Sequence, residues 1–394
     1  MALLEVAGLT KSFRRHQVLG DITLRVDAGE IIVVFGPSGT GKTVLLRLVA
    51  GLEEPTAGSI AIEGRDMADV PPEERGVGMA FQNFALFPHM TAFENIASPL
   101  RASRANGAVV AGVDKVARLL KIDHVLSHAP RELSNGQKQR TSLARALAAS
   151  PKLLLLDDPL RNVDAKLRFE MRLELPRLLR QSGSAVLYVT QDYKEAMALA
   201  DRIAVLRDGA FEQVATPEEI YNSPTSLAVA RLFGDPAINI TESRIETLGN
   251  AAVVALAGAL VYLDPGYLPH TGGAVTVGIR PEAVVVAQGS HMPGALAAVV
   301  EAVTPLNERT VLLLKALNGW EFLASLPSWG VAIPEAGAEV EVSFLPGGFH
   351  LFDQETGQRI AATASQELKR WPANSQSNIS TKSTGHAASR PSLR

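Results

Sequence analysis

Residues 36–43 read Gly-Pro-Ser-Gly-Thr-Gly-Lys-Thr, which has the composition and spacing of a phosphate-binding loop. Its glycines allow successive backbone N–H groups to turn toward a phosphate, and the helix that follows adds its positive N-terminal end. The Lys42 ammonium would reach the β- and γ-phosphates of a nucleotide, and the Thr43 hydroxyl would bind Mg²⁺. The predicted contact residues of this phosphate loop are Gly36, Pro37, Ser38, Gly39, Thr40, Gly41, Lys42 and Thr43. We therefore predict a binding site for a nucleoside triphosphate with Mg²⁺.

The segments around this loop have the pattern that the motif requires. The apolar run 31–35 before it indicates a strand, and the apolar repeat from Val44 onward indicates a helix. Two further apolar runs, 153–156 and 185–189, are typical of strands buried on both faces of a parallel sheet. Helical patterns such as 165–180 lie between them, so the first half of the chain predicts an α/β nucleotide-binding domain.

The pattern changes after about residue 235. Short alternating runs are separated there by Gly, Pro and Asn turns, which predicts a separate all-β domain built of small barrels. The last residues, 364–394, are rich in Ser, Asn and Thr, and we expect a disordered tail.

Composition excludes several classes of function. A length of 394 residues predicts two or three domains, and 38 Lys and Arg against 41 Asp and Glu give no basic field for a nucleic-acid partner. The absence of cysteine excludes disulfides, thiolate catalysis and Cys-ligated metals. The N-terminus shows no signal-peptide pattern, and the apolar stretch 251–263 is too short to span a bilayer and reads as two strands around a turn. We expect a soluble, cytoplasmic chain.

Four further segments place polar side chains at the ends of predicted strands and helices. Gln82 follows a strand, and Gly136 belongs to a Ser-Asn-Gly sequence that begins a helical pattern. Asp157 and Asp158 end one apolar run, and Gln191 follows another. Together with the phosphate loop, these segments resemble the ATP-binding cassette (ABC) ATPases that power membrane transporters.

Within that family the chain is most similar to importer ATPases of the maltose and glycerol-phosphate type. The order and spacing of the motifs match over residues 4–222, and the similarity continues through the β-rich region to residue 363. The segments that carry the similarity are 36–38, 85–89, 164–168, 216–221, 278–282 and 350–353.

The resemblance implies an α/β phosphate-loop NTPase fold followed by an all-β C-terminal domain of small barrels similar to oligonucleotide-binding (OB) folds. We expect an ATPase domain at residues 1–235, with a helical signature subdomain at about 84–150. A β-rich regulatory or dimerisation domain would occupy residues 236–363, ahead of the tail at 364–394. The simplest role of the barrels is support of a dimer without a ligand of their own.

In this family two ATPase domains pack head to tail, with ATP between the phosphate loop of one and the signature helix of the other. The Ser134 side chain and the backbone N–H of Gly136 would then contact the γ-phosphate across the dimer. Asp157 would hold Mg²⁺ through water, and Gln82 would sense Mg²⁺ and relay the ATP state to the membrane subunits. The further nucleotide contacts that the resemblance implies are Phe13, Asn135, Gln137 and Asp164. Phe13 would stack on adenine, unless it is a core residue.

The resemblance also implies partners. Integral membrane permease subunits would dock near Phe84–His89, where His89 is either a contact or simply an exposed loop residue. A second ATPase subunit, which is either this chain or a relative, would complete the dimer. A periplasmic or extracellular solute-binding protein would act indirectly. The chain would lie at the inner face of the cell membrane as a peripheral protein.

Four residues depart from the family pattern. Asp158 stands where the family has the glutamate that activates water, and its side chain is shorter by on the order of 1.5 Å. Gln191 replaces a histidine that contacts the γ-phosphate, and it can donate a hydrogen bond but carries no charge. Asn135 replaces the first glycine of the signature, which is the mildest change. Arg161 replaces a serine, and it either pairs with Asp158 or faces solvent.

These departures lead to a hypothesis about rate. Asp158 and Gln191 mark the slow site in heterodimeric members of the family, although the altered signature lies here on the same chain. We therefore expect an ATPase that couples hydrolysis to import of a carbohydrate or polyol, that is slow, and that works beside a more competent partner. The alternatives are a nucleotide-gated regulatory subunit, a polyamine or inorganic-ion importer ATPase, and a soluble cassette ATPase of repair or translation.

Overall fold

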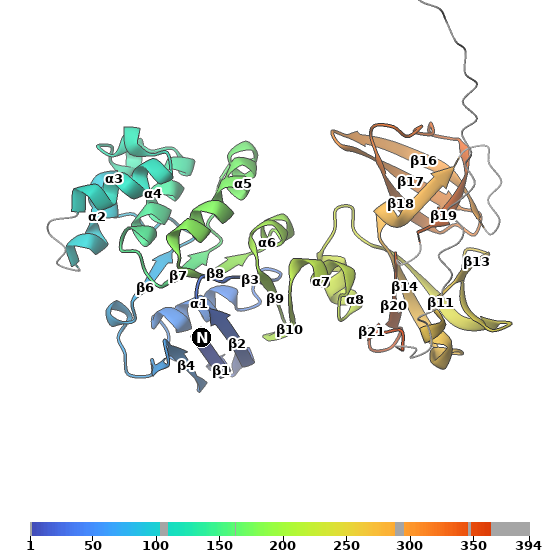
Figure 1. Cartoon of the computed structure of the whole chain (residues 1–394), viewed down its shortest axis with the longest axis horizontal. Coiled ribbons are helices and arrows are strands. Elements are labelled where there is room, and N and C mark those ends of the chain that lie inside the picture. Colours follow the sequence, from blue (N-terminus) through green and yellow to red (C-terminus); the bar gives the residue numbers. More distant parts are fainter. Residues whose placement is uncertain (1, 103–108, 162, 288–294, 346–347, 364–394) are drawn as a thin grey trace, which may run out of the picture.

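The computed structural model describes residues 2–102, 109–161, 163–287, 295–345 and 348–363. The α/β half and the all-β half lie side by side and are joined through the short helices α7 and α8 (Figure 1). The predicted tail at 364–394 lies outside the described residues. In the part of the chain that is described, no helix combines the length and the apolar character needed to cross a bilayer.

A six-stranded sheet in the order β10-β9-β3-β8-β7-β6 forms the centre of the first half. Neighbouring strands from β9 to β6 are parallel, and β10 is antiparallel to β9. All residues of β3, β7 and β8 are buried, as predicted from their continuous apolar runs. The strands are β3 (Ile31–Phe35), β6 (Val77–Ala80), β7 (Leu153–Asp157), β8 (Ala185–Thr190), β9 (Arg202–Arg207) and β10 (Ala210–Ala215).

A second sheet, in the order β2-β1-β4-β5, is antiparallel. One hydrophobic core joins this sheet, helix α1 (Lys42–Ala50) and one face of the central sheet, so the helix that follows the phosphate loop is fixed from two sides. The strands are β1 (Ala2–Phe13), β2 (His16–Asp27), β4 (Ala57–Ile62) and β5 (Arg65–Asp66).

Helices α2 (Ala92–Ala102), α3 (Val109–Leu119) and α4 (Asn135–Ala148) form a helical group beside β6 and β7 (Figure 1). The α4 helix begins with a capping box, in which Ser134 accepts a hydrogen bond from the Gln137 N–H and donates its own N–H to the Gln137 side chain. The predicted helix start at the Ser-Asn-Gly sequence is therefore correct.

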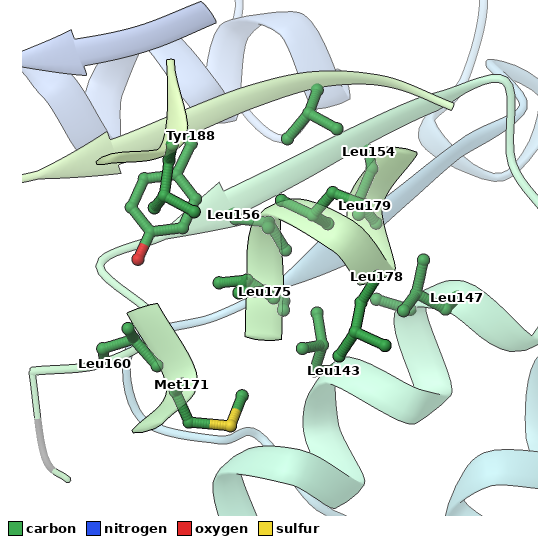
Figure 2. Close-up of a cluster of buried hydrophobic side chains, with 14 of the residues drawn as sticks. Leu143, Leu147, Leu154, Leu156, Leu160, Met171, Leu175, Leu178, Leu179 and Tyr188 are labelled. Carbon is green, nitrogen blue, oxygen red and sulfur yellow. The ribbon is translucent and has the colours of Figure 1, made fainter. Parts of the chain in front are cut away.

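Helix α5 (Ala165–Ser182) covers the other face of the central sheet. Figure 2 shows Leu175 and Leu179 among side chains of β7 and α4, with Tyr188 of β8 close by. This cluster ties the strand that carries Asp157 to the helical group.

Three short helices follow: α6 (Tyr193–Leu199), α7 (Pro217–Asn222) and α8 (Leu227–Leu232). The second half then contains two sheets, in the orders β13-β12-β11-β14-β20-β21 and β15-β19-β16-β17-β18, which share one core. Their strands are β11 (Asn239–Leu248), β12 (Ala251–Leu256), β13 (Ala259–Tyr262), β14 (Ala274–Ile279), β15 (Val284–Ala287), β16 (Leu296–Leu306), β17 (Arg309–Ala316), β18 (Glu321–Pro327), β19 (Glu339–Phe344), β20 (Phe349–Asp353) and β21 (Arg359–Ile360). The predicted all-β region is confirmed.

Arg280 joins the two halves. It follows β14, is buried, and donates hydrogen bonds to the carbonyl oxygens of Tyr221 (2.9 Å), Ala230 (3.1 Å) and Phe233. Its guanidinium also stacks 4.0 Å from the centre of the Tyr221 ring. The cation thus satisfies backbone carbonyls at the ends of α7 and α8 that would otherwise lack donors.

Core packing around α5 predicts a contrast between two leucines. Leu175→Ala removes a fully buried side chain and should lower the free energy of unfolding by about 2 to 5 kcal/mol. Leu173→Ala, on the same helix but 67% exposed, should change it by about 0.5 kcal/mol or less. Urea unfolding followed by far-UV circular dichroism checks this, since all described α-helices lie in the first half. Equal losses would contradict the packing in Figure 2.

Candidate functional site

The phosphate loop runs from the end of β3 to the start of α1, and two of its positions admit only glycine. A Cβ atom on Gly36 would lie 2.2 Å from the Leu206 carbonyl oxygen of β9. Gly41, at the N-terminus of α1, has a left-handed φ of 98°, and a Cβ there would lie 2.7 Å from the Leu19 side chain. The phosphate loop therefore packs closely against β9 and the Leu19 side chain, and its conformation requires glycine at both positions.

Lys42 is buried inside this loop. Its ammonium donates hydrogen bonds to the carbonyl oxygens of Gly36 (2.8 Å) and Pro37 (2.6 Å). Burial lowers the pKa of Lys42, the carboxylates of Asp158 and Asp157 oppose this, and the charge of Arg161 adds to the lowering. The cation is thus held where phosphate oxygens would compete with the loop carbonyls for it.

Thr43, at the start of α1, contacts Asp157, the last residue of β7. The Thr43 hydroxyl donates a hydrogen bond of 2.9 Å to the Asp157 carboxylate at the end of β7. Burial raises the pKa of Asp157, and the Thr43 hydrogen bond opposes this. A hydroxyl and a carboxylate in this position are the hard oxygen donors that suit Mg²⁺, which takes its remaining ligands from water and phosphate. The donor set therefore fits this ion.

A cavity of about 230 Å³ gathers the strand-end residues around the phosphate loop. We call it the phosphate cavity. Its lining residues are Val18, Ser38, Gly39, Gly41, Lys42, Thr43, Val44, Gln82, Asp157, Asp158, Arg161, Val189 and Gln191. The sequence predicted Gln82, both carboxylates and Gln191 as site residues, and the structure brings all four together. Val18 was not predicted, because nothing in its own segment signals a site.

Asp158 has an unusual backbone and a charged neighbour. Its φ is 45°, in the left-handed region, and its N–H donates to the Val189 carbonyl at 2.9 Å. The Asp158 carboxylate lies 3.8 Å from the Arg161 guanidinium, so the ion pair considered from the sequence is present. Burial raises the pKa of Asp158 to about 6, and Arg161 opposes the rise.

Gln191 belongs to a turn that a buried carboxyl group stabilises. Glu195, which is 1% exposed, accepts hydrogen bonds from the Tyr188 hydroxyl (2.8 Å) and the Thr190 hydroxyl (2.9 Å). The Thr190 oxygen also accepts the Asp192 N–H at 3.0 Å, so the network encloses Gln191 from both sides. Sequence reasoning missed Glu195, since a lone glutamate near a helix start resembles a solvated residue.

Comparisons with known proteins agree with this geometry. A family model described as "ABC transporter" matches residues 19–161, and a "TOBE domain" model matches residues 277–352. The protein named sn-glycerol-3-phosphate import ATP-binding protein UgpC, from Escherichia coli strain K12, is 40% identical over 372 residues, covering 91% of this chain and all of its own length. The same values hold for the UgpC protein of Shigella sonnei. The chain belongs to the ABC transporter ATP-binding proteins.

A solved structure supports the fold of the first half. The dimeric structure of a bacterial ABC transporter cassette has a TM-score of 0.51 and 28% identity, covering 54% of this chain and 98% of its own. The predicted family, the phosphate-loop ATPase fold and ATP binding are therefore confirmed.

Several residues that the family resemblance implies do not line the phosphate cavity of their own chain. Ser134, Asn135, Gly136, Gln137 and Asp164 are absent from its lining. The four signature residues cap and begin α4.

Phe13 also lies outside the cavity lining. It is 42% exposed at the end of β1, with the Lys11 ammonium 4.7 Å from the ring centre. The alternative that Phe13 is a core residue is therefore wrong.

The segment Phe84–His89 borders a second, larger hollow of about 1050 Å³. Arg145 of α4 donates a hydrogen bond of 2.6 Å to the Ala85 carbonyl, and its guanidinium lies 5.5 Å from the Phe87 ring centre. Phe87 and His89 are both exposed. The residues around this hollow are Glu73, Gly76, Val77, Gly78, Met79, Phe81, Ala85, Phe87, Ser98, Pro99, Arg145, Ala146, Ala149 and Pro151. We call it the side hollow.

The buried carboxyl of Glu195 predicts a pH-dependent stability. Burial raises its pKa from 4.5 to about 7, so between these values the folded chain binds more protons than the unfolded chain. Wild type should therefore lose stability relative to Glu195→Gln as pH rises from 4.5 to 7, by about 3 kcal/mol in total. Urea unfolding across this range measures the difference.

Glu219 provides a control of opposite sign. Its pKa is lowered because the Glu219 carboxylate accepts hydrogen bonds from the backbone N–H and the hydroxyl of Thr216, so wild type should gain stability relative to Glu219→Gln as pH rises through the acidic range. A flat difference for Glu195→Gln would show that this carboxyl does not titrate in the window given.

Proposed function

We propose that this chain is the ATP-hydrolysing, energy-coupling subunit of a bacterial importer for a carbohydrate or polyol, at the inner face of the cell membrane. The observation that carries the proposal is the gathering of Lys42, the Thr43–Asp157 pair and Asp158 in one cavity. The glycerol-phosphate import relatives support the cargo class, which the permease and a solute-binding protein would select.

The lining residues divide the chemistry among them. The Lys42 ammonium and the N–H groups of the phosphate loop would bind the β- and γ-phosphates, with the α1 N-terminus adding positive potential. Thr43, Asp157 and Gln82 would hold Mg²⁺. When bound, this ion neutralises charge that develops on the phosphate oxygens. Asp158 would accept a proton from the attacking water.

A second ATPase subunit would complete the site. The phosphate cavity, at about 230 Å³, is smaller than the roughly 300 to 1,000 Å³ of ordinary ligand sites, so part of the nucleotide would lie outside it. The capped N-terminus of α4 in the partner would add backbone N–H groups and dipole to the γ-phosphate. Ser134, Asn135, Gly136, Gln137 and Asp164 would serve the partner's nucleotide in this way, and Phe13 would stack on adenine.

Asp158 supports the hypothesis of slow hydrolysis. Its carboxylate is one methylene short of the family's glutamate, so it would lie farther from the attacking water. A misplaced general base costs a factor of about 10² to 10⁴ in rate. The alternative of a nucleotide-gated regulatory subunit draws on the same residues, and it differs in that such a subunit binds ATP without meaningful catalysis.

The side hollow is the proposed docking site for the permease. Ala85 lines it and follows Gln82 of the phosphate cavity by only three positions. Hydrogen bonds from Ser142 (2.7 Å) and Arg145 (3.4 Å) hold the Phe84 carbonyl to α4. A partner that fills the hollow would therefore contact a segment that α4 holds in place and that follows Gln82 closely in the chain.

Restoring the family residues tests the proposed rate limitation. Wild type should hydrolyse ATP slowly in the absence of a partner, and Asp158→Glu/Gln191→His should raise steady-state turnover by about 10²-fold, because the longer base reaches the water. Lys42→Ala is the control, and it should remove turnover in either background. Fast hydrolysis by wild type would show that Asp158 and Gln191 are competent as they stand.

Membrane association tests the proposed docking site. Phe87→Ala removes an exposed ring at the side hollow and should reduce the fraction that sediments with cell membranes about tenfold. Leu317→Ala, which truncates an 84% exposed side chain of the second half, should leave this fraction unchanged. Both variants should bind ATP as wild type does. Equal sedimentation of the two variants would place the permease contact elsewhere.

A further inference from the structure

We propose that Arg161 supplies the positive charge at the γ-phosphate that Gln191 cannot supply. The proposal rests on the proposed function in requiring ATP in the phosphate cavity. It goes further in assigning a binding role to a side chain that the family's pattern does not contain. In the family the cation is a histidine after β8, and in this chain it would come from the loop after β7.

The loop that carries Arg161 is well anchored. Leu160 and Val163 are buried on either side of it, and the Arg161 N–H donates to the Asp158 carbonyl at 3.2 Å. From α5, the Arg168 guanidinium donates to the carbonyls of Arg161 (3.1 Å) and Val163 (3.0 Å). The backbone of Arg161 is thus held on both sides, and its side chain projects from a fixed point.

The charges around the phosphate cavity show why a second cation matters. Among its described lining residues, Lys42 and Arg161 are the basic ones, and Asp157 and Asp158 are the acidic ones. A bound triphosphate adds several negative charges to this set. Gln191 offers an amide N–H but no charge, so Arg161 is the lining residue that can compensate the γ-phosphate in addition to Lys42.

The ion pair between Arg161 and Asp158 is weak, so Arg161 can readily exchange this carboxylate for a phosphate. At 3.8 Å it is longer than a hydrogen bond, and the Arg161 side chain is 49% exposed, so water screens the attraction. A guanidinium binds two phosphate oxygens at once in a planar fork, which favours exchange of the carboxylate for phosphate. The same movement would release Asp158 from its ion pair and leave it available to the attacking water.

Two other roles for Arg161 make opposite predictions. As a brake, Arg161 would only restrain Asp158, and its removal would speed hydrolysis without changing nucleotide affinity. As a surface residue that faces a second subunit, it would affect neither property in the monomer. A γ-phosphate contact predicts weaker binding of ATP but unchanged binding of ADP.

The test compares nucleotide affinities of the full chain, diluted until light scattering shows a monomer. With Mg²⁺ present, Arg161→Ser should raise the Kd of a non-hydrolysable ATP analogue about tenfold or more and leave the Kd of ADP within about twofold. Arg161→Lys should lose less than Arg161→Ser, because it keeps the charge. Arg180→Ser, which removes an exposed arginine at the far end of α5, is the matched control and should change neither affinity.

A second variant makes the test independent of folding. Asp158 lines the same cavity and also takes up a proton near pH 6, so each affinity is compared with that of Arg161→Ser alone at the same pH. Relative to that variant, Arg161→Ser/Gln191→His should bind the analogue more tightly at pH 6 but not at pH 8, because a histidine carries its charge only at the lower pH. Equal analogue affinity for Arg161→Ser and wild type would overturn the proposal, as would faster hydrolysis at unchanged affinity. If wild type binds neither nucleotide and Lys42→Ala makes no difference, the proposed function fails together with this role. If wild type binds both and only the Arg161 effect is missing, this role alone fails.

Discussion

The hydrogen bond between Thr43 and Asp157 is the contact on which the rest of the site depends. It joins residues that are 114 positions apart in the chain. The contact is possible because β8 lies between β3 and β7, so the ends of three parallel strands meet at one edge of the sheet. Gln191 follows β8 and therefore arrives at the same edge. Ligand sites in sheets of this kind form outside the carboxyl ends of the strands for this reason.

Much of this arrangement could be predicted because it depends on short-range patterns. The phosphate loop can be recognised from eight consecutive residues. The runs 153–156 and 185–189 are apolar throughout because both faces of these strands are covered. The all-β half was predictable from its alternation. These features reflect local backbone demands and burial, which a sequence records directly.

Other features depend on which distant groups meet, and the sequence left them open. The pairing of Arg161 with Asp158 was one of two alternatives, and geometry decided it. For Phe13 the sequence favoured a ring that stacks on adenine but left a core position open as the alternative. Glu195 gave no signal, because its importance comes from two hydroxyls on a strand that only the fold places against it. The residues that form such contacts recur with no fixed period or spacing along the sequence, so no sequence pattern predicts them.

Several arginines of this chain bind backbone carbonyls, either at the end of a helix or in a loop. Arg75 donates to the carbonyls of Leu48 and Val49 at the end of α1, Arg145 to the loop at residues 84–85, and Arg168 to the loop that carries Arg161. A helix C-terminus has both unpaired carbonyls and negative potential, so a buried cation satisfies two needs at once. Arg75 is the example at a helix C-terminus, whereas Arg145 and Arg168 bind carbonyls of loops.

Arg280 binds backbone carbonyls in the same way at the junction of the two halves. This contact limits how the first half of one such chain can be fused to the second half of another. A cassette cut after residue 235 would keep the carbonyls of Tyr221, Ala230 and Phe233 but lose the guanidinium that satisfies them. Helices α7 and α8 therefore belong structurally to both halves. A chimera that takes its barrels from a relative would keep this joint only if those barrels place an arginine against the same three carbonyls.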